Sequence, residues 1–414
     1  MEVFYIMNLE VLSPVGDWER LCSAVDFGAD AVYLGRKNFG MRANPQNFDL
    51  DTLKKAMELC HSRGVKVYVT CNTLPRNDEI KDFQQFVEEA VECKVDALIV
   101  ADLGLLSLIK QYAPNMEVHM STQTGIVNYV TANALYNMGC KRVVLARELS
   151  LDEIAEIRAK TPKELDIEAF VHGAMCMSFS GRCLLSSYFT NRDANRGECA
   201  QPCRWGYYLM EEKRPNEYHP VFEDEKGSYI LNAKDMCMIN HLDDVIKAGV
   251  NSLKIEGRAK SSYYVSVITN AYRQAVDIYK KDPDNYQLPQ WLQDEVFKVS
   301  HRQYCTGFFY GHPKDCKYFG QYYENGGYIR SYDVVAVVDD YKDGTLYCTQ
   351  RNKFLKGAEV EILAPVSKPV AVTINEIINE KGESVDMANH AMMKFSFKCD
   401  TPFPKNSIIR MKKD

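Results

Sequence analysis

Four of the chain's fourteen cysteines lie close together, separated by gaps of six, fifteen and three residues: Cys176, Cys183, Cys199 and Cys203. Glycine and arginine are frequent in the same stretch. Thiolates are soft ligands that bind zinc, copper and iron. Four of them in one glycine-rich loop therefore indicate a metal or cluster site.

The spacing argues against two uses of these thiols. Structural zinc sites commonly pair CxxC knuckles, and a thioredoxin-like redox pair needs the same motif. The closest pair here is Cys199-x3-Cys203. An iron–sulfur cluster needs no fixed short spacing between its ligands, so the pattern favours a [4Fe–4S] cluster over zinc. Cys237 could replace one ligand, although its position at a predicted helix start favours packing.

The length and composition of the whole chain indicate its general class. Its 414 residues are 46% hydrophobic and 26% charged, which predicts two domains with a sizeable core. No apolar run could span a bilayer and the N-terminus lacks a basic signal region, so we expect a cytoplasmic protein with no membrane partner. The net charge of −6 argues against non-specific coating of nucleic acid but allows a local basic patch.

Residues 9 to 260 alternate short β-branched runs with amphipathic segments, which predicts parallel strands joined by helical crossovers. Strands are expected at 9–12, 31–34, 66–72, 97–101, 118–122, 142–146, 166–171, 229–231 and 252–255. Helices are expected at 17–27, 50–61, 80–91, 127–138, 151–159 and 262–279, with Asp17 and Ser150 as N-caps. This is the size of a TIM-like (β/α) barrel. An open doubly wound sheet is the alternative, weakened by the lack of GxGxxG after the first strand.

The pattern changes toward the C-terminus. We assign residues 1–281 to the barrel, 282–330 to a connector and 331–414 to an all-β domain, expected to be a small barrel. Its strands are expected at 334–338, 345–349, 358–362, 370–374, 393–397 and 407–411. Asp343-Gly344 is a hairpin signal.

Polar residues follow the predicted barrel strands, and in such a barrel these positions share one mouth. The sequence therefore predicts a polar substrate pocket there. The residues expected to bind substrate are His119, Gln123, Arg147, His172, Lys254, Glu256 and Arg258. Glu168 and His172 stand four apart on one predicted strand, so we expect them on the same face, where they could bind a metal, although no third ligand is evident.

The cysteine stretch resembles the signature of the peptidase U32 (collagenase-like) family. The matching positions are Glu168, Phe170, Gly173, Ala174, Met175, Cys176, Gly181, Cys183, Leu185 and Ser186. The resemblance extends through RDANRGECAQPCRW, ILNAKD and SLKIEGRAKS, and back to LSPVGDWERLCSAVDFGADAVYLG, so it covers essentially the whole barrel. The C-terminal domain is similar to that of the family's longer branch.

The resemblance implies a function. Family members were first labelled peptidases, whereas others are hydroxylation factors with a [4Fe–4S] cluster on four cysteines. For the longer branch it implies conversion of the wobble uridine of tRNA to 5-hydroxyuridine, with prephenate as co-substrate. By position, the cluster ligands would be Cys176, Cys183, Cys199 and Cys203. Some relatives work as pairs, so a homodimer or a heterodimer with a family relative is left open.

These expected partners select further residues. Phosphate contacts are expected from Arg182, Arg192, Arg196, Arg204 and Lys260. Tyr188, Phe189, Trp205, Tyr207 and Tyr208 could stack an unpaired base. Prephenate carboxylates would meet Arg147, Lys254 and Arg258, with His119 and Gln123 as hydrogen-bonding partners.

Two alternatives stay open. Proteolysis is disfavoured because the chain has neither HExxH nor GxSxG, and its cysteines come as a group instead of one nucleophile beside a histidine. A non-catalytic accessory subunit that binds a cluster and RNA without turnover is the other alternative.

Overall fold

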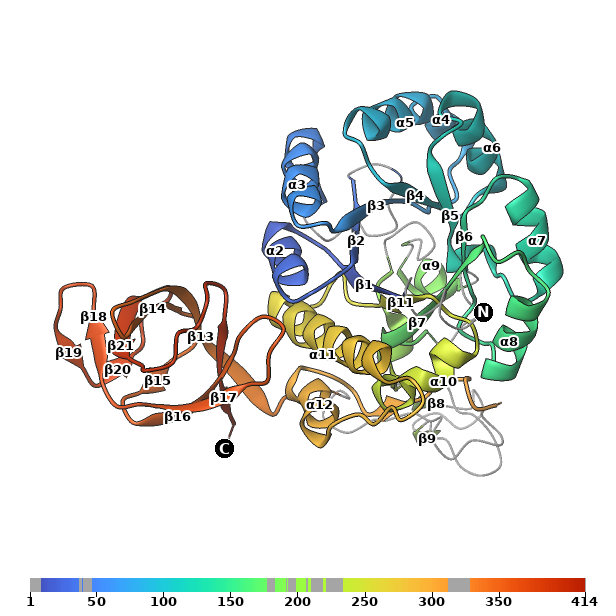
Figure 1. Cartoon of the computed structure of the whole chain (residues 1–414). Helices are drawn as coiled ribbons and strands as arrows, with labels where there is room; N and C mark the ends of the chain where they lie inside the picture. Colours follow the sequence, from blue (N-terminus) through green and yellow to red (C-terminus); the bar gives the residue numbers. More distant parts are fainter. Residues whose placement is uncertain are drawn as a thin grey trace.

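Eight parallel strands form a barrel surrounded by helices, and a β domain lies to one side of it (Figure 1). The computed structural model describes residues 9–36, 39, 47–176, 183–190, 192, 199–205, 208–209, 219–220, 234–311 and 328–413. The barrel strands are β1 (Glu10–Pro14), β2 (Ala31–Gly35), β3 (Lys66–Cys71), β4 (Ala97–Val100), β5 (Glu117–Met120), β6 (Arg142–Val144), β7 (Asp166–Ala174) and β11 (Ser252–Ile255).

Strand β11 closes the barrel. It pairs in parallel with β1, where Ser252 lies opposite Glu10, and with β7, where Ser252 lies opposite Glu168. An open doubly wound sheet has two free edges instead. The predicted TIM-like barrel is therefore confirmed and the doubly wound alternative is wrong.

The helices between the strands begin where the sequence predicts a cap. Asp17 and Ser150 accept hydrogen bonds from the first turns of α2 and α8, and Ser150 forms a capping box with Glu153. The helix expected at 80–91 is interrupted and forms α4 and α5. The barrel helices are α2 (Trp18–Asp26), α3 (Leu50–Ser62), α4 (Asn77–Ile80), α5 (Phe83–Glu92), α6 (Leu103–Tyr112), α7 (Tyr129–Asn137), α8 (Leu151–Ala159), α10 (Leu242–Lys247) and α11 (Ser262–Lys281). Among the described residues, no helix is long and apolar enough to cross a bilayer.

Two further strands extend the sheet beyond the barrel. β10 (Asp235–Cys237) runs antiparallel to β7, and β12 (Tyr304–Cys305), from the predicted connector, pairs with β10. The strand expected at 229–231 lies outside the described residues. The sheet is therefore extended by two strands beside β7, the strand that leads into the cysteine segment (residues 176–205).

The main core packs between the strands and their helices, whereas a second apolar cluster lies inside the barrel. The inner cluster consists of Leu12, Ala31, Tyr33, Tyr68, Ala97 and Ile99. Small alanines beside large tyrosines fill part of the interior as in other barrels of this type. Several other interior positions carry buried charged side chains, among them Glu10, Arg142 and Glu168.

The C-terminal domain is the predicted all-β unit, an antiparallel sheet with its own apolar core. Its strand order is β17-β16-β22-β13-β14-β21-β18-β19. The strands are β13 (Tyr332–Lys342), β14 (Thr345–Gln350), β16 (Ala358–Leu363), β17 (Val370–Ile374), β18 (Ile377–Asn379), β19 (Ser384–Val385), β21 (Lys394–Lys398) and β22 (Ile408–Lys412). Asp343 and Gly344 both have positive φ and join β13 to β14, which confirms the predicted hairpin.

Ionic contacts fix this domain to the barrel side. The guanidinium of Arg410 on β22 contacts Glu295 at 2.5 Å and Glu361 at 2.7 Å. Glu295 ends helix α12 (Gln290–Glu295), and Lys298 just beyond it binds Glu361 at 2.9 Å. Because Arg410 and Glu295 are buried, these charges must be satisfied by each other, which fixes the orientation of β22 against α12.

Candidate active site at the mouth of the barrel

A network of paired charges fills the barrel below its mouth. Arg142 on β6 contacts Glu10 on β1 at 2.6 Å and Glu168 on β7 at 3.1 Å. Glu168 also accepts a hydrogen bond of 2.6 Å from Lys254 on β11, and Tyr68 donates one of 2.6 Å to Glu10. Two carboxylates thus offset two cations. All these side chains are buried, so each charge depends on its partners.

The pairs keep the carboxylates ionised. Burial alone would raise the pKa of Glu10, but the charge and hydrogen bonds of Arg142 lower it to about 2. Burial also opposes ionisation of Glu168, and Lys254 and Arg142 outweigh it and lower that pKa too. Lys254 therefore meets a permanent negative charge on its inner side.

Three cationic side chains gather at the mouth. The Nζ atom of Lys254 lies 4.6 Å from the ring centroid of Tyr33 and 5.3 Å from that of Phe170. Arg147, also predicted to bind substrate, stacks on the Phe170 ring, with its Cζ 3.8 Å from the ring centroid. Its guanidinium donates a hydrogen bond of 2.7 Å to Ala174 O. Lys254 is already paired with Glu168, whereas the Arg147 guanidinium lies 3.8 Å from Glu256 and keeps its charge over the Phe170 ring, so Arg147 is the better placed of the two to meet an anion.

The loop after β11 supplies two more of the residues predicted at the mouth, Glu256 and Arg258. Arg258 donates to Asn47 Oδ1 at 3.0 Å and to Thr70 Oγ1 at 3.5 Å, while Glu256 lies 3.8 Å from Arg147. This loop packs against glycine on both sides. A Cβ on Gly35 would lie 2.2 Å from Arg258 Nη2, and one on Gly173, at φ +112°, would lie 2.4 Å from Glu256 O. Any larger residue at either position would displace the loop.

Gln123 offers an unused hydrogen-bond acceptor. It lies in the 3₁₀ turn η1 (Thr122–Thr124), just after β5, and only 8% of it is exposed. Within the part of the chain that the structure describes, its Oε1 has no hydrogen-bond partner. A buried polar atom without a partner costs free energy unless a ligand or water fills the role. Gln123 therefore fits a ligand-binding group.

His119 points away from the mouth. It is fully buried, its Nε2 lies 2.9 Å from Glu117 Oε1 at the start of the same strand, and its ring packs edge-on against Tyr68. Burial lowers the pKa of His119, so the ring stays neutral. The structure thus separates His119 from Gln123, which the sequence had grouped as joint partners of one ligand.

His172 and Glu168 do not share a face, and that prediction was wrong. The register of β7 against β11 shifts: Lys254 lies opposite Phe170, but Ile255 lies opposite His172. The extra residue, Val171, forms a β-bulge that reverses the alternation of side chains. Glu168 consequently points into the barrel and His172 away from it.

His172 lies between tyrosines outside the barrel. Its Nδ1 is 3.4 Å from the hydroxyl of Tyr272 on α11, and its Nε2 is 3.3 Å from that of Tyr304 on β12. Burial lowers the pKa of His172 to about 3. Its surroundings are those of a neutral packing residue.

The four signature cysteines lie at the mouth end of β7 and in the segment that follows, and none of the four is in a disulfide. Cys176 is exposed, and the other three are half-buried. Near α9 (Leu185–Thr190) and the turn η3 (Pro202–Arg204), Ala200 N donates to Ser186 Oγ and Gln201 N donates to Cys199 Sγ at 3.4 Å. Backbone donors to sulfur are among the contacts that tune iron–sulfur clusters.

The thiols are not gathered into a ligand set. Among the residues that the structure describes, no three His, Cys, Asp or Glu side chains lie close enough together to hold a metal ion. The donor chemistry fits a cluster, since the four residues supply thiol sulfur and are at least partly exposed. The ligand assignment therefore stays a prediction. Cys237 is half-buried, and the burial of its thiol raises the pKa to about 12, as expected for a packed cysteine.

The predicted RNA contacts are only partly described. Arg192 is exposed beyond the end of α9. Lys260 is engaged inside the protein, 3.4 Å from Ser300 O and 4.0 Å from Asp235. Arg182 and Arg196, and the side chain of Arg204, lie outside the described residues.

The interior network is the part of the site that sequence reasoning missed. Its signal was present, because Glu10 and Arg142 each stand at the start of a run that otherwise reads as a buried strand. A charge in such a run must find a partner inside the barrel.

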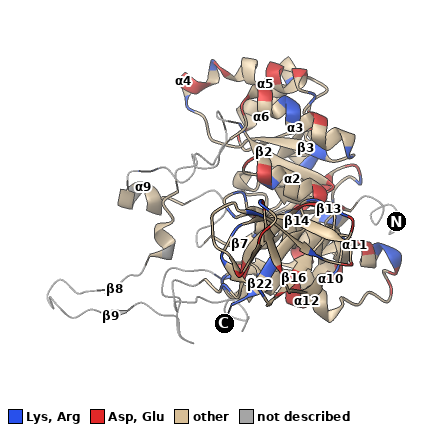
Figure 2. Cartoon of the chain, turned by 90° about the vertical axis from the view of Figure 1, so that its left-hand side faces the viewer, with Lys and Arg blue, Asp and Glu red and all other residues tan. Residues whose placement is uncertain are grey.

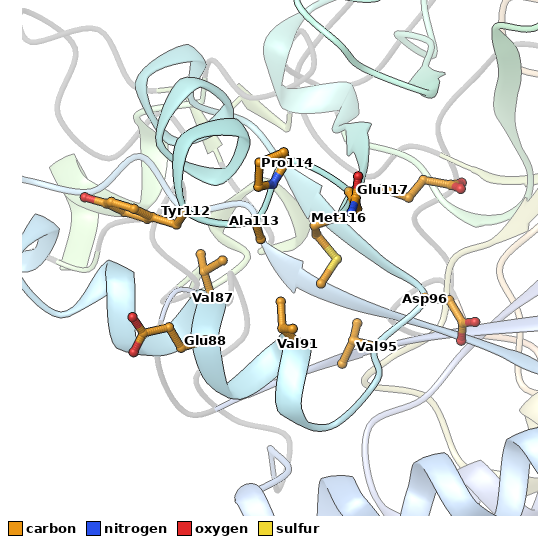
Figure 3. A pocket seen from close by; sticks show the side chains of 11 residues that line it. Val87, Glu88, Val91, Val95, Asp96, Tyr112, Ala113, Pro114, Met116 and Glu117 are labelled. Carbon is orange, nitrogen blue, oxygen red and sulfur yellow. The ribbon is translucent and has the colours of Figure 1, made fainter.

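A separate pocket of about 440 Å³ lies on the outside of the barrel, between α5 and the end of α6 (Figure 3). Apolar side chains such as Val87, Val91 and Met116 line it, with Glu117 at its edge. Glu117 begins β5, so this pocket belongs to the end of the barrel opposite to the mouth. It shares no lining residue with the predicted substrate site.

Comparison with known proteins agrees with the signature. The model of Peptidase family U32 matches residues 16–318, and that of the Peptidase family U32 C-terminal domain matches residues 330–410. The chain is 36% identical to tRNA hydroxylation protein P1 of Bacillus subtilis, over 97% of this chain and 94% of that protein.

Two further relatives carry different names. Identity is 36% with tRNA hydroxylation protein P of Escherichia coli, over 92% of this chain and 91% of that protein. It is 33% with a collagenase of Porphyromonas gingivalis, over 74% of each. With the two family models covering both parts of the chain, the chain belongs to peptidase family U32.

Proposed function

We propose that this chain is an enzyme that hydroxylates tRNA, forming 5-hydroxyuridine at the wobble position with prephenate as co-substrate. The observation that carries the proposal is the end-to-end similarity to proteins named for tRNA hydroxylation, across both domains. A cationic mouth and an accessible cysteine segment beside it provide the surfaces that an anionic co-substrate and RNA would need.

The mouth supplies orientation for the co-substrate. Arg147 can pair with a carboxylate, while Gln123 Oε1 accepts from a hydroxyl. Lys254 is held in position by its hydrogen bond to Glu168, which uses one of the three N–H donors of its ammonium group. Preorganised donors of this kind bind an anion without reorganisation.

The cysteines would hold the cofactor. Cys176, Cys183, Cys199 and Cys203 supply the four thiolates that a [4Fe–4S] cluster requires. When bound, such a cluster supplies one-electron redox chemistry. The contribution of the chain is to place the cysteine segment at the mouth end of β7, beside the co-substrate site.

A peptidase is the second candidate because the family name and the collagenase of P. gingivalis carry that activity. The site gives it little support. His119 and His172 contact a glutamate and two tyrosines, not a Ser or Cys nucleophile. Peptidase activity therefore has no catalytic pair to act through at these histidines.

Reconstitution tests the proposal. Anaerobically purified protein, unmodified tRNA and prephenate should yield 5-hydroxyuridine, measured by mass spectrometry of the digested tRNA. Omission of prephenate should abolish the product. Cluster-loaded protein that binds tRNA but needs another chain for every turnover would identify an accessory subunit instead.

A further inference from the structure

Three large apolar side chains are exposed on the cysteine segment. The exposed fractions are 55% for Leu184, 56% for Phe189 and 43% for Trp205. Leu184 and Phe189 flank or belong to α9, and Trp205 directly follows η3. Exposed aromatic side chains that lie together mark interaction sites more often than isolated ones do.

The segment lies over the barrel axis. In Figure 1 α9 projects into the centre of the ring of strands, and in Figure 2, turned by 90°, it stands clear of the barrel body. The two views together place α9 beyond one end of the barrel. Because the chain enters this segment from β7, that end is the mouth. A group resting on Phe189 or Trp205 would therefore lie on the same side of the barrel as the predicted substrate site.

Local contacts hold the two rings in place. The ring centroids of Phe189 and Trp205 are 6.3 Å apart at 61°, an edge-to-face contact. Trp205 N donates to Pro202 O at 3.1 Å, and Ala200 N donates to Ser186 Oγ at 3.0 Å, which ties the turn to the helix. The rings form a small fixed platform.

The charge beside the platform indicates its occupant. Arg192, exposed just beyond the last turn of α9, accepts a hydrogen bond from Ser187 Oγ through its carbonyl oxygen. From position 182 to 204 the sequence carries four arginines against one Asp and one Glu. Aromatic faces beside arginine suit a nucleotide, whose base stacks while its phosphate is neutralised. An apolar protein interface would deplete charge around the rings.

We propose that Phe189 and Trp205 form a stacking platform for one unpaired nucleobase of RNA on the mouth side of the barrel. The inference rests on the proposed function and adds to it the surface that receives the base. Single-stranded loops are where proteins find unstacked bases, and stacking on aromatic side chains is tolerant of sequence.

Binding of two RNAs to the full-length protein tests the platform. One RNA is a hairpin with an unpaired loop, and the other is a blunt duplex with the same number of phosphates. We expect Phe189→Ala and Trp205→Ala each to weaken hairpin binding about tenfold, within the range for loss of one stacked base, and to leave duplex binding unchanged. Trp205→Phe should retain most of the affinity, since it keeps an aromatic face. Tyr112→Ala, at an exposed aromatic on the opposite end of the barrel, is the matched control and should change neither.

Other results would overturn the platform. Equal hairpin affinity for the wild type and both alanine variants, in a protein that still hydroxylates tRNA, removes the platform but leaves the proposed function standing. A change in oligomeric mass without a change in RNA affinity assigns the rings to a protein interface. Failure of the wild type both to bind the hairpin and to hydroxylate tRNA ends the proposed function itself.

Discussion

The barrel interior and the cysteine segment hold their functional groups in opposite ways. Inside the barrel, Glu168 satisfies Arg142 and Lys254 at distances of 3.1 Å and 2.6 Å, and all three are buried. On the segment, the four thiols are at least partly exposed and do not converge. The interior charges are therefore paired with one another, whereas the thiols of the segment stand at the surface of the protein. We expect mutations to separate stability, which depends on the interior, from the cofactor and RNA binding that we propose for the segment.

The largest effect on stability is expected at Glu168. Glu168→Gln keeps the shape but leaves Lys254 and Arg142 buried with one carboxylate fewer, which should cost about 3–5 kcal/mol in the free energy of unfolding measured with urea. Glu156→Gln removes a surface partner of Lys160 at the same 2.6 Å distance and should produce no measurable change. Equal effects for the two variants would contradict a paired interior.

A smaller effect is expected from pH. His172 stays neutral in the folded chain because burial lowers its pKa to about 3, whereas an unfolded histidine titrates near 6.5. The unfolded state thus binds the extra proton, so this stabilisation is present above about pH 6.5 and is lost as the pH falls toward 3. Between about pH 6.5 and 5 the loss should reach about 2 kcal/mol for this histidine.

Urea unfolding at several pH values measures this loss. His172→Asn should reduce the slope of the unfolding free energy against pH by the equivalent of one bound proton. His390→Asn, at an exposed histidine, should leave that slope unchanged. An unaltered slope in His172→Asn would show that this ring is accessible to protons in the folded state.

Cysteine variants should separate iron binding from stability: a variant in the cysteine segment should lose iron, and a variant in the barrel should lose stability. Cys203→Ala should abolish anaerobic iron and sulfide content while changing the stability of the iron-free protein by less than about 1 kcal/mol. Cys71→Ala, at a fully buried site on β3, should cost about 1 kcal/mol through the cavity it leaves and keep the iron. Stoichiometric zinc without iron in the anaerobic wild type would rule out the cluster.

The smallest effect is expected at Arg192. Arg192→Ala removes one exposed cation from the segment and should weaken all RNAs by a similar few-fold factor. The slope of the logarithm of RNA affinity against the logarithm of salt concentration should become shallower by about one, because one fewer counterion is released. An effect confined to the hairpin would place Arg192 at a base and not at a phosphate.

Sequence reasoning reached the fold because alternation, caps and turn residues all agree. The strand pattern predicted β1 to β7 and β11, and Asp343-Gly344 predicted its hairpin. The inserted Val171 was not foreseeable, since a bulge has no distinct local signature and yet turns His172 away from the mouth. Arg147 lies near Glu256 and shares the Phe170 ring with Lys254, as expected from their positions at strand ends, while their role in binding substrate stays a prediction. How the four cysteines close on a ligand depends on that ligand, and the order of residues alone does not contain it.

The proposed hydroxylation of the wobble uridine of tRNA can be measured by mass spectrometry of tRNA nucleosides from a strain without the gene. We expect 5-hydroxyuridine to disappear in this strain, to return with the wild-type gene and not to return with Cys176→Ala. Persistence of the modification in a strain that has no second copy of the gene would contradict it.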